Sequence, residues 1–402
     1  MMKELIKDMY EEFKRKNFAL NEKVKIKNQK VKENKNSGNE ELKQLRESIK
    51  DGKLKLEVFK TNLDNAAKSL PNSTHPDTPL TEALLIKQFG EENSSAHFND
   101  HVNLTKSLDL AEFTKAGKVT GSGFYFLKNS AVILEQALIN YAIDFLTLQG
   151  FLPMTTPDLV RRSVLDNCGF QPRTDDNQTY FINGTAEGSE NQLCLSATSE
   201  FPLAGIHSGE MVDLKSPIKY AGIGHCFRAE GVAGGTNRGL FRVHQFSKVE
   251  MFALTDPKDS EKVFDEFIDL QIKLFAGLGL CFRVLNMPIV DLGAPAYKKY
   301  DIEAWMPGRK GWGEISSTSN CTDYQSRRLN IRYFSKENNN RPDFVHTVNG
   351  TAVAIPRLII AILENNQKKN GDVIIPEVLI PYCLGGRLKV IKHQKSLLEM
   401  LD

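Results

Sequence analysis

The segments Cys226–Glu230 (Cys-Phe-Arg-Ala-Glu) and Gly239–Glu250 (Gly-Leu-Phe-Arg-Val-His-Gln-Phe-Ser-Lys-Val-Glu) decide the fold of this chain. Both alternate apolar and polar side chains, and a glycine-rich run that reaches Arg238 separates them. The pattern predicts a β-hairpin, in which residues two apart point to the same face. Arg228 and Glu230 would therefore face one ligand together, and Phe246 would be available from the return strand.

These three residue types suit a nucleotide. A guanidinium pairs with phosphate oxygens, a carboxylate accepts from an amine, and an aromatic ring stacks on a flat base. Taken singly, such residues are as well explained as ion-paired strand residues or, for the aromatic ring, as core. Taken together and in register, they favour a nucleotide site. No Gly-x-Gly-x-x-Gly follows a predicted strand and no P-loop sequence occurs, which argues against a Rossmann or P-loop site.

The net charge of +2 hides an asymmetry between the two ends of the 402-residue chain. Residues 1–70 hold 18 Lys and Arg against 12 Asp and Glu, a net +6, whereas residues 71–402 hold 34 against 38, a net −4. A basic N-terminal segment is expected if that segment binds a polyanion. The alternative is a charged, solvated helix. The overall composition, 41% hydrophobic and 25% charged, is that of an ordinary soluble globular protein.

The cysteines and histidines give little support for a metal site. Six cysteines are scattered without a Cys-x-x-Cys pair, which indicates reduced thiols and argues against zinc. His97 and His101 have the i, i+4 spacing of a helical metal pair, but no further ligand is near and we expect surface histidines. No apolar run approaches the ~20 residues that span a bilayer, so no membrane partner is expected.

The N-terminal region reads as two long helices. Apolar residues recur at positions 42, 45, 49, 56, 59, 63 and 70, with Ala66 filling one step and Gly52 interrupting, and a looser stripe runs through 5, 9, 13, 20, 24 and 31. A turn cluster at 34–39 lies between the two stripes. The pattern predicts an antiparallel coiled-coil hairpin with helices ~45 Å long. Prolines between 71 and 79 end it, so we predict an arm at 1–78 and a globular domain at 79–402.

The rest of the chain predicts an α+β domain with a largely antiparallel sheet. Residues 80–128 read as a mixed linker. A buried helix follows from Ser130 to the glycine at 150, and then a strand at 151–157. Further strands are predicted at 190–200, 217–228, 241–254, 281–290 and 344–347, and helices at 260–277 and 356–367.

In these segments the chain resembles class II aminoacyl-tRNA synthetases, and among them seryl-tRNA synthetases. The hairpin resembles motif 2 of the class, Asn349–Arg357 with the helix after it resembles motif 3, and the helix from Ser130 with its strand resembles motif 1, the dimerisation element. Thr198–Glu200 corresponds to the family's Thr-x-Glu loop, with Ser199 where alanine is usual, and Glu314–Ser317 to its third nucleotide segment. The basic arm is itself a feature of seryl enzymes.

The resemblance implies ATP-dependent activation of L-serine to seryl-adenylate and transfer to tRNA(Ser) by a homodimer that uses Mg²⁺ and no zinc. It implies catalytic roles for Arg228, Arg357 and Glu314; serine binding by Thr198, Ser199, Glu200, Arg228, Glu250 and Thr351; ATP binding by Arg228, Ala229, Glu230, Arg242, Phe246, Glu314, Ile315, Ser316, Ser317, Asn349 and Arg357; and Mg²⁺ coordination by Glu314 and Ser317 together with the ATP phosphates. Asn320 is a further candidate contact.

Residues 300–308 and 355–357 look most similar to the mitochondrial branch of the family, which implies the mitochondrial matrix, with the cytoplasm as the alternative. Two other functions remain open on the same fold. One is a non-catalytic paralogue that binds RNA or protein through the arm. The other is an ammonia-dependent amino-acid ligase, which the presence of the basic arm disfavours.

Overall fold

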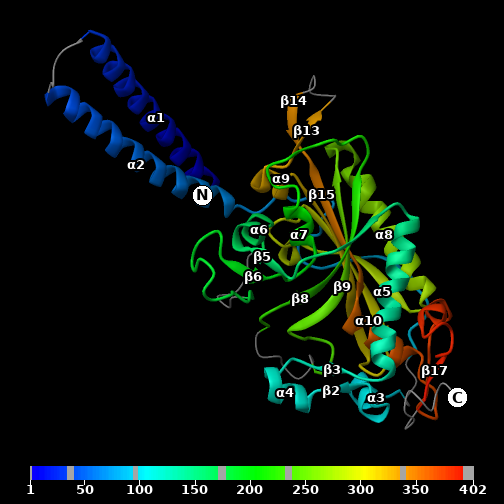
Figure 1. Cartoon of the computed structure of the whole chain (residues 1–402). Coiled ribbons are helices and arrows are strands. Elements are labelled where there is room, and N and C mark those ends of the chain that lie inside the picture. The colour runs from blue at the N-terminus through cyan, green and yellow to red at the C-terminus, as the bar shows by residue number, and fades with distance from the viewer. Residues whose placement is uncertain are drawn as a thin grey trace. The chain divides into compact units, whose positions relative to one another are not determined.

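The chain divides into two units, Met1–Pro71 and Asn72–Asp402. The structure, a computed structural model, describes residues 2–33, 40–93, 98–170, 178–230, 238–335 and 341–392; the predicted turn at 34–39, His97 and the glycine-rich run at 231–237 lie outside them (Figure 1). The division comes earlier than the predicted boundary at 78/79. The reason is that the Asn72 and His75 N–H groups donate to the carbonyls of Ala294 and Tyr297, 2.8 and 2.9 Å away in the second unit.

The first unit is a hairpin of two helices, α1 (Met2–Glu33) and α2 (Glu40–Lys68). Its contacts run in opposite directions along the two helices, as an antiparallel hairpin requires. Lys16 lies over the Phe59 ring, Lys23 donates to the Ser48 hydroxyl, and Lys30 pairs with Glu41 at 2.9 Å. The predicted antiparallel pairing of the two helices is therefore present.

The predicted apolar stripe of α2 faces α1. Leu42, Ile49 and Leu63 are buried, and the other predicted positions of α2 are half-buried. The stripe of α1 is looser, as its sequence suggested, because Leu5 is 58% exposed. Gly52 marks a close approach of the helices, since a Cβ placed there would lie 3.0 Å from Leu20 Cδ1.

The second unit is built on an eight-stranded sheet in which one neighbouring pair, β4 with β8, is parallel and the others are antiparallel. In sheet order the strands are β1 (Leu84–Phe89), β10 (Phe282–Asn286), β11 (Lys298–Met306), β12 (Gly311–Thr322), β15 (His346–Ala354), β9 (Gln245–Thr255), β8 (Ile218–Phe227) and β4 (Leu152–Thr155). The α+β architecture with a largely antiparallel sheet that the sequence predicts is confirmed.

Three helices cover one face of this sheet: α5 (Ser130–Leu148), α8 (Ser260–Gly277) and α10 (Ile355–Asn365) (Figure 1). The largest apolar core lies between them and the sheet. Alternation along β9 sends Met251 and Ala253 into this core, and Phe252 and Leu254 into a smaller core on the other face. The even-numbered side chains of β9, Glu250 among them, therefore lie on the face of the sheet that the three helices do not cover.

The remaining elements are shorter. They are α3 (His101–Ser107), β2 (Ala111–Glu112), α4 (Thr114–Thr120), β3 (Phe126–Leu127), β5 (Leu159–Arg161), α6 (Arg162–Asn167), β6 (Leu193–Leu195), α7 (Glu200–Gly205), β7 (Met211–Val212), η1 (Pro257–Asp259), η2 (Ile289–Asp291), α9 (Tyr324–Leu329), β13 (Arg332–Ser335), β14 (Arg341–Phe344), β16 (Val373–Ile374), η3 (Glu377–Tyr382) and β17 (Val390–Ile391).

Two sequence predictions about the elements were wrong, and two strands were not predicted. The region 80–128 is no linker, since it contributes β1, the edge strand of the large sheet. The strand predicted at 190–200 is limited to β6, and Glu200 begins α7. The long strands β11 and β12 were missed because β12 is rich in Ser and Thr and lacks an alternating apolar pattern.

The sequence prediction that no apolar run approaches the length of a membrane span was wrong for α5, which is long and apolar enough to cross a membrane and is the one such helix among the described residues. Seven of its residues are buried, however, and Ala131, Leu134 and Leu138 belong to the main core. These contacts are those of the core helix of a globular domain.

Gln271 of α8 is fully buried and fastens this helix to two strands. Its amide nitrogen donates to the carbonyls of Thr351 (2.9 Å) and Ser317 (3.1 Å), and its oxygen accepts from the Thr318 hydroxyl (2.9 Å). We expect Gln271→Met to lower the free energy of unfolding by about 1–3 kcal/mol, because buried carbonyls lose their donor. Urea unfolding measures this; the matched control Gln136→Met, exposed on α5, should stay within about 0.5 kcal/mol of the parent chain. Equal midpoints for all three proteins would contradict the expectation.

Candidate active site

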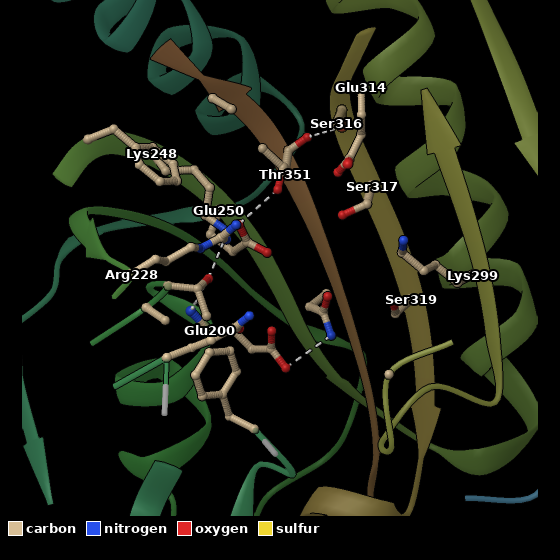
Figure 2. A pocket seen from close by; sticks show the side chains of 18 of the residues that line it. Glu200, Arg228, Lys248, Glu250, Lys299, Glu314, Ser316, Ser317, Ser319 and Thr351 are labelled. Carbon is tan, nitrogen blue, oxygen red and sulfur yellow. Dashed lines mark hydrogen bonds and ion pairs between the residues drawn. The ribbon is translucent and has the colours of Figure 1, made fainter. Parts of the chain in front are cut away.

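A cavity of about 480 Å³ opens on the sheet face opposite α5, α8 and α10. Side chains from β9, β15, β12 and β11 line it, together with the segments that follow β8 and precede α10. Figure 2 shows two walls, with Glu200, Arg228, Lys248 and Glu250 on one side and Lys299, Glu314, Ser317 and Ser319 on the other. The sheet therefore forms the floor of the site and contributes side chains to both walls.

On β9, strand alternation points Phe246, Lys248 and Glu250 into the cavity. Lys248 is buried; its ammonium forms a close ion pair with Glu250 and donates to the Thr198 hydroxyl at 2.8 Å. The predicted partners Thr198 and Glu250 are thus brought together by a lysine that sequence reasoning missed. Lys248 lies two residues from both Phe246 and Glu250, which were predicted site residues, and this spacing could have identified it.

Thr351 faces Glu250 across the β15–β9 pair, and its hydroxyl donates to Glu250 Oε2 at 3.2 Å. The pairing skips Ala352, a β-bulge, so that Ala354 lines the cavity although it lies three residues from Thr351. Two residues further back, the Asn349 amide donates to Glu200 Oε1 at 3.2 Å. Because of this bulge, Asn349, Thr351 and Ala354 of β15 all line the same cavity.

A second bulge at Ile315 sets the opposite wall. Ile302 pairs with Ser316 and Glu303 with Glu314, so Ile315 is the extra residue of β12. In a regular strand Glu314 and Ser317, three apart, would face opposite sides of the sheet. The bulge puts both into the cavity. Ile315 packs in the main core, and the Ser316 hydroxyl donates to the Thr351 carbonyl at 2.6 Å, so their predicted ATP contacts are limited to backbone atoms.

Arg228 lies just beyond the end of β8 at Phe227, so the predicted strand geometry of Arg228 and Glu230 was wrong. Both nevertheless line the cavity. The Arg228 guanidinium is 5.3 Å from the centre of the Phe246 ring, and its Nε is buried without a partner among the described residues. Glu230 instead pairs with Arg242 at 2.5 Å. An unpartnered buried guanidinium N–H is a ready donor for an anionic ligand.

Arg357, in the first turn of α10, reaches the opposite wall. Its Nη1 donates to the Glu314 carbonyl at 2.8 Å and lies 3.3 Å from the Glu314 carboxylate, and its Nε donates to the Phe241 carbonyl at 3.2 Å. Burial raises the pKa of Glu314, but Arg357, Lys299 and Arg228 more than offset it and the net pKa is lowered. The Glu314 carboxylate is therefore held in its ionised form, and it lines the cavity.

Comparison with known proteins identifies the family of this chain. The sequence profile described as "tRNA synthetase class II core domain (G, H, P, S and T)" matches residues 181–366. A serine–tRNA ligase of Treponema denticola is 46% identical over 350 residues, which are 85% of this chain and 81% of that protein. This chain belongs to the seryl-tRNA synthetase family.

Solved structures agree. The seryl-tRNA synthetase of Pyrococcus horikoshii complexed with ATP has a TM-score of 0.86 at 35% identity and covers 98% of this chain and 93% of its own. The cytoplasmic serine–tRNA ligase of Naegleria fowleri in complex with AMP has a TM-score of 0.82 at 31% identity, covering 98% and 92%. The prediction of an aminoacyl-tRNA ligase of this family from sequence is confirmed.

In this seryl-tRNA synthetase, sequence reasoning also missed Lys299 of β11. Lys299 lines the cavity and is held by Asp301 at 2.8 Å. Burial raises the pKa of Asp301 to about 7, an effect that Lys299 opposes and Glu314 reinforces. Charge alone gave no signal for Lys299, because the strand that positions it was not predicted.

Three predicted contacts lie elsewhere. The Ser199 side chain packs beneath the cavity, where its hydroxyl accepts from Thr156 at 3.1 Å, and neither Ser199 nor Ala229 lines the cavity. Asn320 points to the helix side of the sheet and donates to Glu261 at 3.0 Å. For these positions the sequence pattern did not reveal which way the backbone turns.

Two glycines of β8 explain where Ser199 lies. Gly222 and Gly224 pair with Glu250 and Lys248 across the hairpin. A Cβ at Gly224 would lie 2.6 Å from Ser199 Oγ, and one at Gly222 would lie 2.7 Å from Leu203 Cδ1. The start of α7 therefore packs directly on bare backbone, which brings Thr198 within reach of Lys248.

The donor set of the site fits a hard divalent cation better than zinc. No group of three or more His, Cys, Asp or Glu within the described residues could hold a metal ion by itself. Glu314 and Ser317 offer two oxygen donors on one wall, and Mg²⁺ is usually bound by one or two carboxylates together with substrate phosphates and water.

His101, predicted to be a surface residue, is buried, so that prediction was wrong.

Burial raises the pKa of the Glu200 carboxyl to about 7, and the charge of Glu250 adds to the shift. Below this pH the carboxyl is neutral and binds an ammonium poorly. We therefore expect the KM for serine to fall by up to about tenfold between pH 6 and pH 8, as the ionised fraction grows. Pyrophosphate exchange at saturating ATP measures it.

Two variants control this experiment. Glu200→Gln should show a pH-independent KM for serine, whereas Asp301→Asn, whose parent carboxyl titrates in the same range, should keep the pH dependence. A Glu200→Gln profile that follows the parent enzyme would contradict the assignment.

Proposed function

We propose that this cavity carries out the two reactions of a serine–tRNA ligase: L-serine and ATP give seryl-adenylate and pyrophosphate, and the seryl group then passes to tRNA(Ser). The observation that carries the proposal is the charge distribution. The carboxylates of Glu200 and Glu250 and the guanidinium groups of Arg228 and Arg357 line the same cavity. An amino acid and a triphosphate together need both kinds of group, carboxylates for the ammonium and guanidinium groups for the carboxylate and the phosphates.

In the first reaction a serine carboxylate oxygen bonds to the α-phosphorus of ATP, and the bond to the oxygen bridging to the β-phosphate breaks. No protein nucleophile is required; the enzyme must place the two reactants in line and balance phosphate charge. Arg228, with its unpartnered Nε, would hold the α-phosphate and the serine carboxylate. Arg357 and Lys299 would hold the departing phosphates.

Serine binding would use the carboxylates and hydroxyls that line the cavity. Glu250 and Glu200 would accept from the ammonium group and the hydroxyl, and Thr198 and Thr351 would complete the pocket. Lys248 balances the charge of Glu250 and fixes the Thr198 hydroxyl. Alanine would leave these polar groups unpaired, which is the stronger form of discrimination.

The adenine ring would stack on Phe246, with Glu230 accepting from its exocyclic amine. Arg242 holds Glu230 in place at 2.5 Å. Mg²⁺ would be bound by Glu314, Ser317 and ATP phosphate oxygens, and it supplies charge neutralisation at the phosphates when bound. Asn349 would assist by holding Glu200 rather than by touching ATP, since its amide donates to that carboxylate.

The competing functions fit less well. A non-catalytic paralogue has no need for buried, paired charges around such a cavity, and these groups are costly unless they are used. An ammonia-dependent ligase would not need the basic helical hairpin of the first unit.

Serine-dependent ATP–pyrophosphate exchange tests the proposal directly, with alanine and threonine as control substrates. We expect Arg228→Ala to reduce exchange by at least about 100-fold, because charge stabilisation in the reaction is lost. Arg332→Ala is the matched control, since Arg332 also lies over an aromatic ring, Phe344 at 4.6 Å, but outside the cavity. Retained exchange in a folded Arg228→Ala protein would show that the phosphate contact is misassigned.

The first unit would bind tRNA. Its net +6 charge suits phosphate contacts, which position a nucleic acid without reading its sequence. Deleting residues 1–70 should leave exchange largely intact, because the second unit has its own core, but abolish tRNA charging. Circular dichroism checks that the truncated protein is folded. Equal loss of exchange and charging in a folded truncation would count against this role.

A homodimer is a further part of the proposal. Apolar side chains remain exposed where motif 1 is expected to pair: Val132 and Leu148 of α5 are 39% and 84% exposed, and Leu152 of β4 is 57% exposed. Light scattering would decide between the mass of one chain and of two.

We also propose a location in the mitochondrial matrix, with the cytoplasm as the alternative. This proposal rests on the resemblance of residues 300–308 and 355–357 alone, and fractionation of the source cells would decide it.

A further inference from the structure

We propose that His101 is a positioning residue for the ATP end of the cavity, and that it acts on Arg357 through the backbone of residues 238–241. The inference rests on the phosphate-binding role proposed above for Arg357. His101 touches neither the cavity nor the expected reactants; it lies behind the wall that Phe241 and Arg357 form.

His101 is anchored on one side by Glu364, a fully buried residue of α10. Glu364 Oε1 accepts from the His101 backbone N–H at 2.9 Å and lies 3.4 Å from its Nδ1, and Oε2 accepts from the Arg309 N–H at 3.0 Å. One carboxylate thus joins α3, α10 and the turn between β11 and β12. It also favours the tautomer with a proton on Nδ1, because an ionised carboxylate only accepts.

The other ring nitrogen of His101 holds the end of the long hairpin loop. In that tautomer Nε2 can accept from the Leu240 N–H, 3.3 Å away, whereas the Arg238 carbonyl, 3.2 Å from Nε2, would be a partner only for a protonated Nε2. Gly239 between them has φ +64° and is so close that a Cβ would lie 2.4 Å from Nε2. The loop end and the imidazole therefore fit each other with no space for a side chain.

The next residue transmits this position to the site. The Phe241 carbonyl accepts from Arg357 Nε at 3.2 Å, and the centre of the Phe241 ring is 3.6 Å from the Arg309 guanidinium and 4.9 Å from that of Arg357. Movement of Leu240 would move Phe241 and, with it, the guanidinium that faces the phosphates.

The segment that carries His101 is itself held rigidly. Asn99 exchanges two hydrogen bonds with the Gln367 amide, both 2.9 Å, and a Cβ at Gly308 would lie 2.2 Å from the Asn99 carbonyl oxygen. The imidazole thus stands on a fixed base, as a positioning residue requires.

The test compares two amides that each replace one ring nitrogen. His101→Asn keeps a polar group near the Nδ1 position but cannot reach Leu240, whereas His101→Gln can reach it. In pyrophosphate exchange, His101→Asn should raise the KM for ATP roughly fivefold to tenfold, the effect of about one hydrogen bond, with the KM for serine unchanged within twofold. His101→Gln should stay within about twofold of the parent enzyme.

The matched control is His207→Asn. His207 also bonds a glutamate and a second group, Glu210 and the Tyr220 hydroxyl, but lies outside the cavity, so both KM values should be unchanged. An unaltered KM for ATP in His101→Asn, or a parallel rise in the KM for serine, overturns the inference.

Two further variants keep the result clear. If His101→Asn does not fold, Gly239→Ala takes its place and should raise the KM for ATP alone; no change there overturns the inference equally. Arg357→Ala separates the two levels. Unaltered ATP use in Arg357→Ala refutes the role proposed for that arginine, whereas its loss beside normal His101 variants refutes only the positioning role.

Discussion

The site depends above all on one constraint: β15 lies between β9 and β12 in the large sheet. Antiparallel pairing brings Thr351 opposite Glu250 and Asn349 opposite Ser319, residues that are far apart in the chain. Their main-chain hydrogen bonds fix the distance between the two walls, and Gln271 secures both strands from behind. The polar contacts of the cavity are built on these paired strands.

The charges of the site are arranged in two ways. Lys248 with Glu250, and Lys299 with Asp301, are paired and largely buried, so the cost of their desolvation is offset within the protein. Arg228 is different, because its Nε has no partner in the described part of the chain. The paired groups shape the cavity before any substrate enters, and the unpaired donor leaves an interaction for the substrate to complete.

Much of this was readable in the sequence, for identifiable reasons. The predicted return strand of the hairpin made Phe246 available to the site, which it lines, and the apolar stripe of α2 predicted its buried side. What failed depends on three-dimensional context. No local sequence pattern marks the bulge at Ile315, and the polar residues of β12 do not predict a strand. His101 is buried beside Glu364, which lies 263 residues away in the chain. Ser199 sits in a familiar loop, yet its side chain turns toward Thr156.

The two glycines of β8 bear on how this enzyme can change its substrate. Behind Lys248 and Glu250 the wall is main chain on which α7 rests, and it offers no side chain to shorten. Any substitution at Gly222 or Gly224 adds atoms where there is no room. Access for a bulkier amino acid cannot arise there by a single replacement; it has to come from residues on β15 or β12, or from a displacement of α7. Evolution and engineering of substrate range are therefore directed to the other side of the pocket.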